Sequence, residues 1–285
     1  MKTIAKRALA LLLAAMLTVT LGAAAAWAKS SEYPSVRVYA DGLLTGRAYR
    51  CGEDFYLSVG DVCGYLGLKA EERYERASYD LSIAAPGLTL EAQVGRMYVQ
   101  VNGRWLLNPR GILTTEGRAY FPVDLIEKIF NLRAELSPEK DWLELNLREA
   151  QLLEGGERYY EDTFGSVNLL WLSRLIEAEA GDQPFAGRVA VGNVVLNRVA
   201  SDQFPNTIFD VIFDTKNGVQ FAPVYDGRIY KDAGPLSVIA ACICLEGYRM
   251  AGDSLYFVAP AQTDDSWLKD YYVYVTTIGQ HDFYM

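Results

Sequence analysis

Residues 168–180 read NLLWLSRLIEAEA, and the spacing of their apolar side chains predicts one helix with a buried face. Leu172, Leu175 and Ile176 stand seven, four and three positions before Glu179, so the four side chains share one side of that helix. We therefore expect the carboxyl group of Glu179 to point into the interior of the domain.

Glu177 is the natural comparison within the same helix. It follows Arg174 by three positions and Ser173 by four, which predicts a solvent-facing carboxylate paired with Arg174. Burial disfavours the charged form of a carboxylic acid and raises its pKa, so Glu179 is suited to carry a proton near neutral pH. Such a group can act as a general acid on a glycosidic oxygen. The alternative is a structural glutamate that bonds the backbone at the helix end.

The residues after this helix predict further helices and then strands. Gly181 ends the first helix, and residues 184–201, PFAGRVAVGNVVLNRVAS, form a second whose small side chains permit close packing beside Glu179. A third helix, PLSVIAACICLEGYRM, precedes two strand-like runs, SLYFV and YYVYVTT. We expect an α+β chain whose C-terminal domain, residues 168–285, is mainly helical with a C-terminal β-hairpin.

Six blocks follow one another in this domain: EAEAGDQP, VAVGNVVLNRV, FPNTIFDVI, VQFAPVYDGRIY, LYF and IGQHDF. In this order they resemble the SleB-type cell-wall hydrolase family, which includes spore cortex-lytic enzymes. The resemblance implies a lysozyme-like fold and cleavage of peptidoglycan between N-acetylmuramic acid and N-acetylglucosamine. It places the essential glutamate of the family on Glu179. The chain departs from the family pattern at Glu177, at residues 181–183, and in keeping only Trp267 of a tryptophan-rich stretch.

The family resemblance further implies a lytic transglycosylase with one acid. Glu179 would protonate the leaving oxygen and then, as a carboxylate, take the proton of the muramic C6 hydroxyl while that oxygen closes on C1, which yields a 1,6-anhydro sugar. Hydrolysis by two carboxylates is the alternative, and it needs a second acid roughly 5 to 9 Å away. The sequence singles out none of the available acids, which are Asp226, Glu246, Asp264, Asp265 and Asp282.

Four residues are candidates for substrate binding: Gln220, Tyr256, Trp267 and His281. Amide and aromatic side chains suit the hydroxyls and faces of sugars. For Tyr256 a position in the core is the alternative, and for His281 it is a structural hydrogen bond.

Two rival functions remain open. A cysteine peptidase or amidase would need Cys242 or Cys244 to pair with His281, although both thiols lie in an apolar helical segment where a cysteine is inert. A non-catalytic wall-binding protein would hold glycan with Glu179 as a structural residue. Of the other two cysteines, Cys51 could bond Cys63 in an oxidising compartment, and buried thiols are the alternative.

Residues 33–148 predict a small duplicated α+β domain. The segments 56–70 and 120–134 are similar, and each predicts a strand, a helix and a following strand, ASYDLSIA or DWLELNL. Asn102-Gly103 predicts a hairpin between the copies. Through VNGRWLLN and GRAYFPVDLI the region resembles the copper-amine-oxidase N-terminal-like domain, which implies a positioning or binding module without copper chemistry; a spacer is the alternative. Residues 149–167 are polar and predict a linker.

Residues 1–28 resemble a secretory signal peptide. Three basic residues precede an apolar run, and Ala26-Trp27-Ala28 offers a cleavage site. We expect export to the cell wall or spore envelope, and an uncleaved membrane anchor is the alternative.

Charge and composition narrow the partners. Removal of residues 1–28 takes away three basic residues and no acidic ones, which shifts the formal charge from −9 to −12. An acidic protein is poorly suited to bind nucleic acid or, once the signal is cleaved, a membrane. With one histidine the chain predicts no metal site, and we expect no cofactor. The expected partner is peptidoglycan; the sequence does not indicate whether the protein has protein partners.

Overall fold

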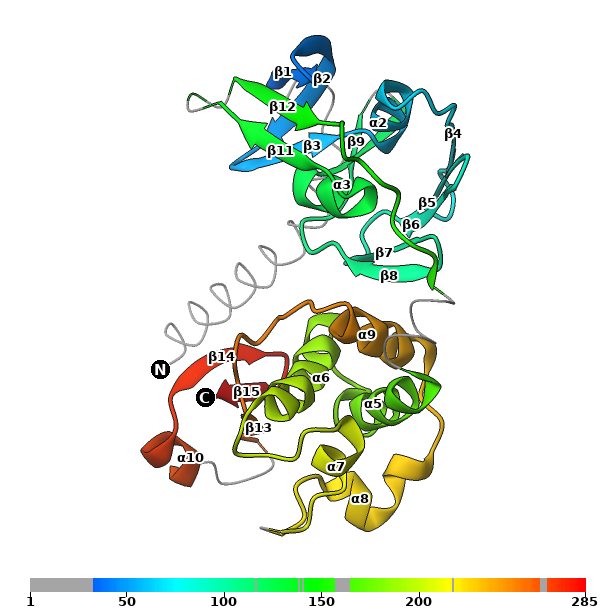
Figure 1. Cartoon of the computed structure of the whole chain (residues 1–285). Coiled ribbons are helices and arrows are strands. Elements are labelled where there is room, and N and C mark those ends of the chain that lie inside the picture. The colour runs from blue at the N-terminus through cyan, green and yellow to red at the C-terminus, as the bar shows by residue number, and fades with distance from the viewer. Residues whose placement is uncertain are drawn as a thin grey trace, which may run out of the picture. The chain divides into compact units, whose positions relative to one another are not determined.

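The chain folds into two units in the computed structural model (Figure 1). The structure describes residues 33–285 except 116, 138, 140, 157–164, 217 and 262–265. The first unit contains the chain up to Asn102 together with Asn108–Glu154, and the second contains Gly103–Leu107 and Gly155–Met285. The predicted signal peptide lies outside the described residues, as does the middle of the predicted linker.

The first unit is built on a seven-stranded sheet of order β11-β12-β1-β2-β3-β10-β9. Its strands are β1 (Ser35–Ala40), β2 (Leu43–Cys51), β3 (Asp54–Leu57), β9 (Leu113–Thr115), β10 (Arg118–Pro122), β11 (Arg133–Leu136) and β12 (Trp142–Asn146). β1 and β12 pair in parallel, so strands from the two ends of the unit meet in the middle of this sheet.

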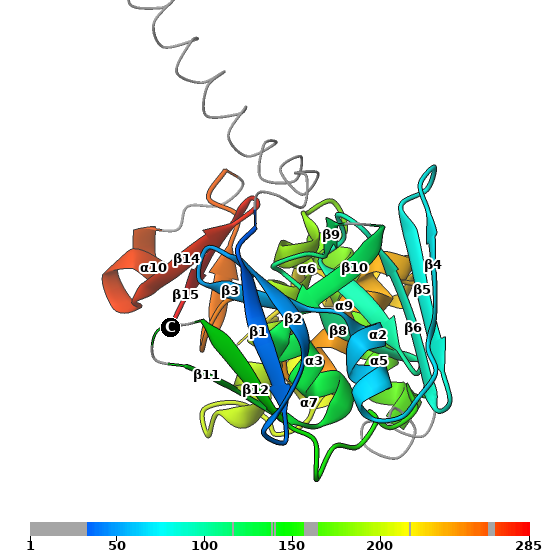
Figure 2. The same ribbon diagram turned by 90° about the horizontal axis from the view of Figure 1, so that it is seen from above.

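A second sheet has the order β4-β5-β6-β7-β8. Its strands are β4 (Glu71–Glu75), β5 (Asp80–Ala85), β6 (Leu88–Gln93), β7 (Tyr98–Val101) and β8 (Arg104–Leu107). Figure 2 shows β4, β5 and β6 side by side, in agreement with their antiparallel pairing. The turn between β7 and β8 has positive φ angles of 49° at Asn102 and 81° at Gly103, which confirms the predicted hairpin.

The two similar segments begin alike and end differently. Each forms a strand followed by a helix, β3 with α2 (Val59–Tyr65) and β10 with α3 (Val123–Phe130), and the two strands pair antiparallel at Leu57 and Phe121. The strand expected after the first helix, however, is β5 in the five-stranded sheet, whereas the one after the second is β12 in the seven-stranded sheet. Both strands predicted after the helices therefore form, but they belong to different sheets, so the two segments do not have the same surroundings.

The second unit combines helices with a small sheet. Its long helices α5 (Gly165–Ala180), α6 (Phe185–Ala200) and α9 (Pro235–Leu245) pack against one another. Shorter helical segments are α7 (Ile208–Ile212), α8 (Ala222–Asp226), η3 (Arg228–Tyr230) and α10 (Ser266–Tyr271). The strands β13 (Tyr256–Val258), β14 (Tyr274–Ile278) and β15 (His281–Tyr284) form an antiparallel sheet of order β13-β15-β14.

The prediction of a lysozyme-like, mainly helical domain with a C-terminal β-hairpin is wrong. The runs SLYFV and YYVYVTT do not pair directly, because the last strand, β15, lies between them and pairs with both. β15 takes the central place since His281, Phe283 and Tyr284 are buried there. The second unit is α+β, and the whole chain is α+β with several sheets.

Close contact between the three long helices depends on a glycine. A Cβ atom on Gly192 would lie 2.7 Å from Sγ of Cys244 and 2.8 Å from Cδ1 of Ile176, so α6 approaches α9 and α5 more closely than any other residue would allow. This agrees with the packing predicted from the small residues of 184–201.

The cysteines form no disulfide within the described residues. Cys51 is exposed, whereas Cys63, Cys242 and Cys244 are buried. As for membranes, no helix in the described part of the chain has the length and apolar character needed to span one.

Candidate active site

A cavity of about 690 Å³ opens beside the C-terminal end of α5 in the second unit. Residues far apart in the sequence form its wall, among them Glu179, Arg198, Gln220, Arg228, Phe257 and His281. Four of the predicted site residues have described side chains. Three of them, Glu179, Gln220 and His281, lie together in this wall, and Tyr256 does not.

Glu179 is half-buried in this wall. Leu172, Leu175 and Ile176 are fully buried on the same side of α5, as the sequence predicts. Burial raises the pKa of Glu179 to about 7, and the negative charge of Asp226 adds to this effect. No described residue hydrogen-bonds the carboxyl group, so nothing ties it to the helix end as the structural alternative requires.

Arg228 places a positive charge near Glu179. Its Nη1 donates to the Ala178 carbonyl oxygen at 2.5 Å, and its Nε donates to Oδ2 of Asp226 at 2.8 Å. Gly227, with φ of 79°, permits the turn that brings Asp226 and Arg228 together. The charge of Arg228 lowers the pKa of Glu179 and so opposes the effect of burial, which favours the carboxylate form once the proton has left.

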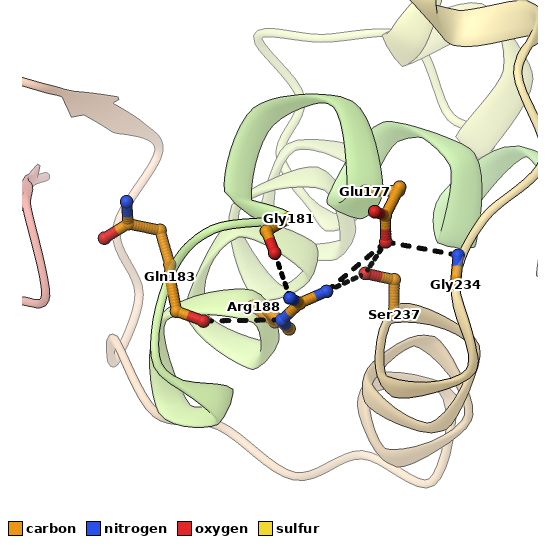
Figure 3. A network of polar contacts seen from close by, with 6 residues as sticks. All are labelled: Glu177, Gly181, Gln183, Arg188, Gly234 and Ser237. Atoms are coloured by element: carbon orange, nitrogen blue, oxygen red, sulfur yellow. Dashed lines mark hydrogen bonds and ion pairs between the residues drawn. The ribbon is translucent and has the colours of Figure 1, made fainter.

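Glu177 does not pair with Arg174, so this prediction is wrong. Its Oε2 instead accepts hydrogen bonds from Oγ of Ser237 at 2.7 Å and from the backbone N of Gly234 at 3.2 Å, and lies 3.3 Å from Nη1 of Arg188 (Figure 3). Arg174 pairs with Asp232. The reason is that α9 and the residues before it cover this side of α5.

Arg188 joins the Glu177 network to the wall of the cavity. Its guanidinium donates to Oγ of Ser237 at 2.6 Å and to the carbonyl oxygens of Gly181 and Gln183 (Figure 3). It thereby satisfies carbonyl groups left open where α5 ends, which a cation does favourably. The same turn carries Gln183, whose Oε1 accepts from the backbone N of Gln280 at 2.8 Å and so holds the turn that precedes His281.

Gln220 and His281 both line the cavity. Gln220 donates through Nε2 to the Gly218 carbonyl and accepts through Oε1 from Nη1 of Arg198 at 3.4 Å. His281 is buried against Phe257, and burial lowers its pKa. Its Nδ1 has no hydrogen-bond partner within the described chain.

The other two candidates do not lie in the described wall. Tyr256 is half-buried in β13, where its hydroxyl accepts from that of Tyr272 and its ring lies 5.4 Å from the guanidinium carbon of Arg198. Trp267 belongs to α10, and its side chain is outside what the structure describes.

Among the described residues, no second carboxylate stands out as a partner for Glu179 in catalysis. Asp226 is paired with Arg228, and Asp282 accepts from Oγ1 of Thr277 in the small sheet. Glu246 caps the end of α9 and does not line the cavity. Asp264 and Asp265 lie outside the described residues. The remaining acids of the wall are Glu177, in the network above, and Asp182.

The described residues also contain no pair of thiol and imidazole. Sγ of Cys244 donates to the Val189 carbonyl at 3.2 Å, and burial raises the pKa of this thiol. Cys244 lines a separate cavity of about 400 Å³, which does not include His281. Within the same described residues, no three histidine, cysteine or acidic side chains are grouped to hold a metal ion.

Sequence reasoning missed three residues of this site. Arg198 is a charged residue in a helix that is mostly apolar, which is a signal because arginine is rarely buried without a purpose. Arg228 and Gln183 gave no such signal, since both lie in polar turns.

One known protein family is similar to the part of the chain that forms this site. Residues 182–284 match the family described as Cell Wall Hydrolase. Residues 182–284 of the second unit are therefore similar to members of this family. The match begins three positions after Glu179, so it does not itself include that residue.

The chain is also similar to individual proteins, among them two spore cortex-lytic enzymes. The chain is 32% identical over 112 residues to a spore cortex-lytic enzyme of Bacillus cereus, covering 39% of this chain and 42% of the relative. It is 29% identical over 120 residues to a spore cortex-lytic enzyme of Bacillus subtilis, covering 42% and 38%. The chain thus spans about two fifths of the length of these relatives.

The chain is also similar to a solved structure, that of the catalytic domain of the germination-specific lytic transglycosylase SleB from Bacillus anthracis. Its sequence identity to this chain is 29% and the TM-score is 0.40, over 44% of this chain and 98% of that domain.

Proposed function

We propose that the second unit cleaves the glycan strands of peptidoglycan between N-acetylmuramic acid and N-acetylglucosamine, with Glu179 as the acid. The observation that carries this proposal is the half-buried carboxyl group in the cavity wall, without a hydrogen-bond partner among the described residues and with a pKa raised to about 7. A group in this state holds its proton near neutral pH and can give it to a glycosidic oxygen. The cell wall hydrolase match and the spore cortex-lytic relatives support the same substrate class.

The reaction we propose is that of a lytic transglycosylase. Glu179 gives its proton to the leaving oxygen as the bond from C1 breaks. The resulting carboxylate then takes the proton of the muramic C6 hydroxyl, whose oxygen bonds to C1 and closes the 1,6-anhydro ring. Arg228 stabilises the carboxylate between these two steps. The pairing of Asp226 with Arg228 favours this route over hydrolysis by two carboxylates, because it engages an acid whose charge acts on Glu179.

Gln220 and His281 are proposed to hydrogen-bond the sugars, since both residues line the cavity. Tyr256 is proposed to support Arg198 beneath the sugar, and Trp267 to stack on the glycan from α10.

The rest of the chain is proposed to deliver this domain to its substrate. Residues 1–28 act as a signal peptide for export to the cell wall or spore envelope. Residues 33–148, which resemble the copper-amine-oxidase N-terminal-like domain, position the enzyme or bind the wall, and residues 149–167 link them to the catalytic domain at 168–285.

The experiment that tests the proposal is a digest of purified vegetative peptidoglycan and of spore cortex, with the products identified by mass spectrometry. The mature protein is compared with Glu179→Gln and with the control Glu177→Gln, which changes a carboxylate of the same helix. We expect 1,6-anhydro-muramyl products from the mature protein and the control but not from Glu179→Gln.

Other products would replace parts of the proposal. Reducing-end sugars lost in Glu179→Gln would establish hydrolysis and require a second acid, with Asp182 the first to test. Released stem peptides would overturn glycan cleavage. Tight binding to peptidoglycan without any fragment would establish the wall-binding alternative.

A further inference from the structure

Arg198 is a buried cation without an anion. Arg198 is 5% exposed, and no carboxylate among the described residues lies within ion-pair distance of its guanidinium. Its Nε donates to the Leu255 carbonyl at 2.8 Å and its Nη1 to Oε1 of Gln220 at 3.4 Å, whereas Nη2 has no partner in the described chain. The negative charge of Asp214 acts on it only from a longer distance.

Three aromatic rings hold the guanidinium in place. Its central carbon lies 4.8 Å from the ring centre of Phe204, 5.1 Å from that of Phe221 and 5.4 Å from that of Tyr256. These cation–π contacts fix the orientation of the planar group. Burial lowers the pKa of Arg198, which shows that the charge has lost hydration, yet an arginine stays protonated. An anion that reaches such a group is attracted more strongly than it would be at the surface.

The cavity gives an anion access to this arginine. Arg198 and Gln220, its hydrogen-bond acceptor, line the same cavity as Glu179. His281 is buried in the same wall, and its Nδ1 is enclosed by the protein without a partner among the described residues. Nη2 of Arg198 therefore remains able to donate to an acceptor that enters the cavity.

We propose that Arg198 binds a carboxylate of the glycan substrate and thereby selects acidic strands, an inference that rests on the function proposed above. The planar fork of an arginine matches a carboxylate with two parallel hydrogen bonds. Peptidoglycan offers two sources of this group. The lactyl ether of muramic acid carries a free carboxylate once the stem peptide is removed, and intact stem peptides carry carboxylates of their own. Both kinds of carboxylate are attached to muramic acid, the sugar whose bond from C1 to the glycosidic oxygen is broken in the proposed reaction.

The test compares strands that differ only in charge. One set is stripped of stem peptides by an amidase, and the other keeps its stems; half of each set is neutralised by carbodiimide coupling to methylamine. The full mature chain, Arg198→Met, Arg198→Lys and the control Arg174→Met are compared by kcat/KM. Arg174 is a suitable control because it pairs with Asp232 and does not line the cavity.

We expect the mature chain to cleave acidic strands at least about tenfold faster than neutralised ones, as a charge-assisted pair is worth roughly 1.5 kcal/mol or more. Arg198→Met should lose this preference, Arg198→Lys should keep part of it, and Arg174→Met all of it. A preference confined to stripped strands assigns the lactyl carboxylate, and one confined to strands with stems assigns the peptide. Equal rates on acidic and neutralised strands of both sets would overturn the proposal, even if Arg198→Met failed to fold.

A binding measurement separates this inference from the proposed reaction. Glu179→Gln, which we expect not to cleave, is titrated with the same four preparations by calorimetry. Tighter binding of acidic strands supports the role of Arg198 whether or not the mature chain cleaves glycan, and equal affinity contradicts it.

Discussion

Glu177 and Glu179 lie two positions apart on α5, line the same cavity and differ in almost everything else. Glu177 accepts from Ser237 and Gly234 and pairs with Arg188. Glu179 has no described hydrogen-bond partner and has a raised pKa. The two carboxyl groups thus differ in their surroundings: hydrogen-bond donors hold that of Glu177, whereas burial without a described donor raises the pKa of Glu179.

The largest effect should come from removing the acid. Glu179→Gln keeps the shape of the side chain but cannot donate a proton, so we expect kcat/KM on peptidoglycan to fall by about 10²–10⁴-fold. Glu177→Gln should lose less than about tenfold. If both variants lost activity to the same extent while folded, the distinction between the two acids would fail.

For stability at pH 7, we expect Glu177→Gln rather than Glu179→Gln to be the damaging variant. Glu177→Gln removes the anion opposite Arg188 and weakens the bonds from Ser237 and Gly234, which should lower the free energy of unfolding by about 1–3 kcal/mol at pH 7. Urea denaturation followed by circular dichroism measures this. A variant as stable as the parent would show that the network of Figure 3 contributes little.

Glu179 should itself destabilise the protein at alkaline pH. Its pKa is about 7 in the fold and near 4.5 when unfolded, so between these values the unfolded chain loses a proton that the folded chain keeps. Stability present below pH 4.5 is therefore lost as the pH rises to about 7. Glu179→Gln should exceed the parent by about 1–3 kcal/mol at pH 8 and match it at pH 4. Denaturation at both values checks this, and a variant less stable at pH 8 would contradict it.

The smallest effects concern the pH dependence of activity. Arg228 lowers the pKa of Glu179 and Asp226 raises it. Arg228→Gln should therefore move the alkaline limb of the kcat/KM profile to higher pH, and Asp226→Asn should move it to lower pH. Shifts in the same direction would show that the two charges do not act on Glu179.

The sequence predicted much of the site but less of the fold. The buried side of α5 and the tight packing at Gly192 followed from spacing and residue size, which are local properties. The partners of Glu177 did not, because Arg188, Gly234 and Ser237 come from segments brought together only by the packing of α6 and α9. The same applies to the small sheet, since its strand order depends on the burial of β15. Arg198 could have been predicted from the sequence, because it is a charged residue in a mostly apolar helix. Arg228 could not, because it lies in a polar turn.

The most direct test of the central claim is the pKa of Glu179 itself. Carbon-13 NMR titration of the mature protein labelled at the glutamate carboxyl carbons gives this value, with the resonance assigned by its loss in Glu179→Gln. We expect a pKa of about 7, coinciding with the alkaline limb of kcat/KM. A value near 4.5 would contradict it, because the carboxyl would then be ionised at neutral pH and could not serve as the acid.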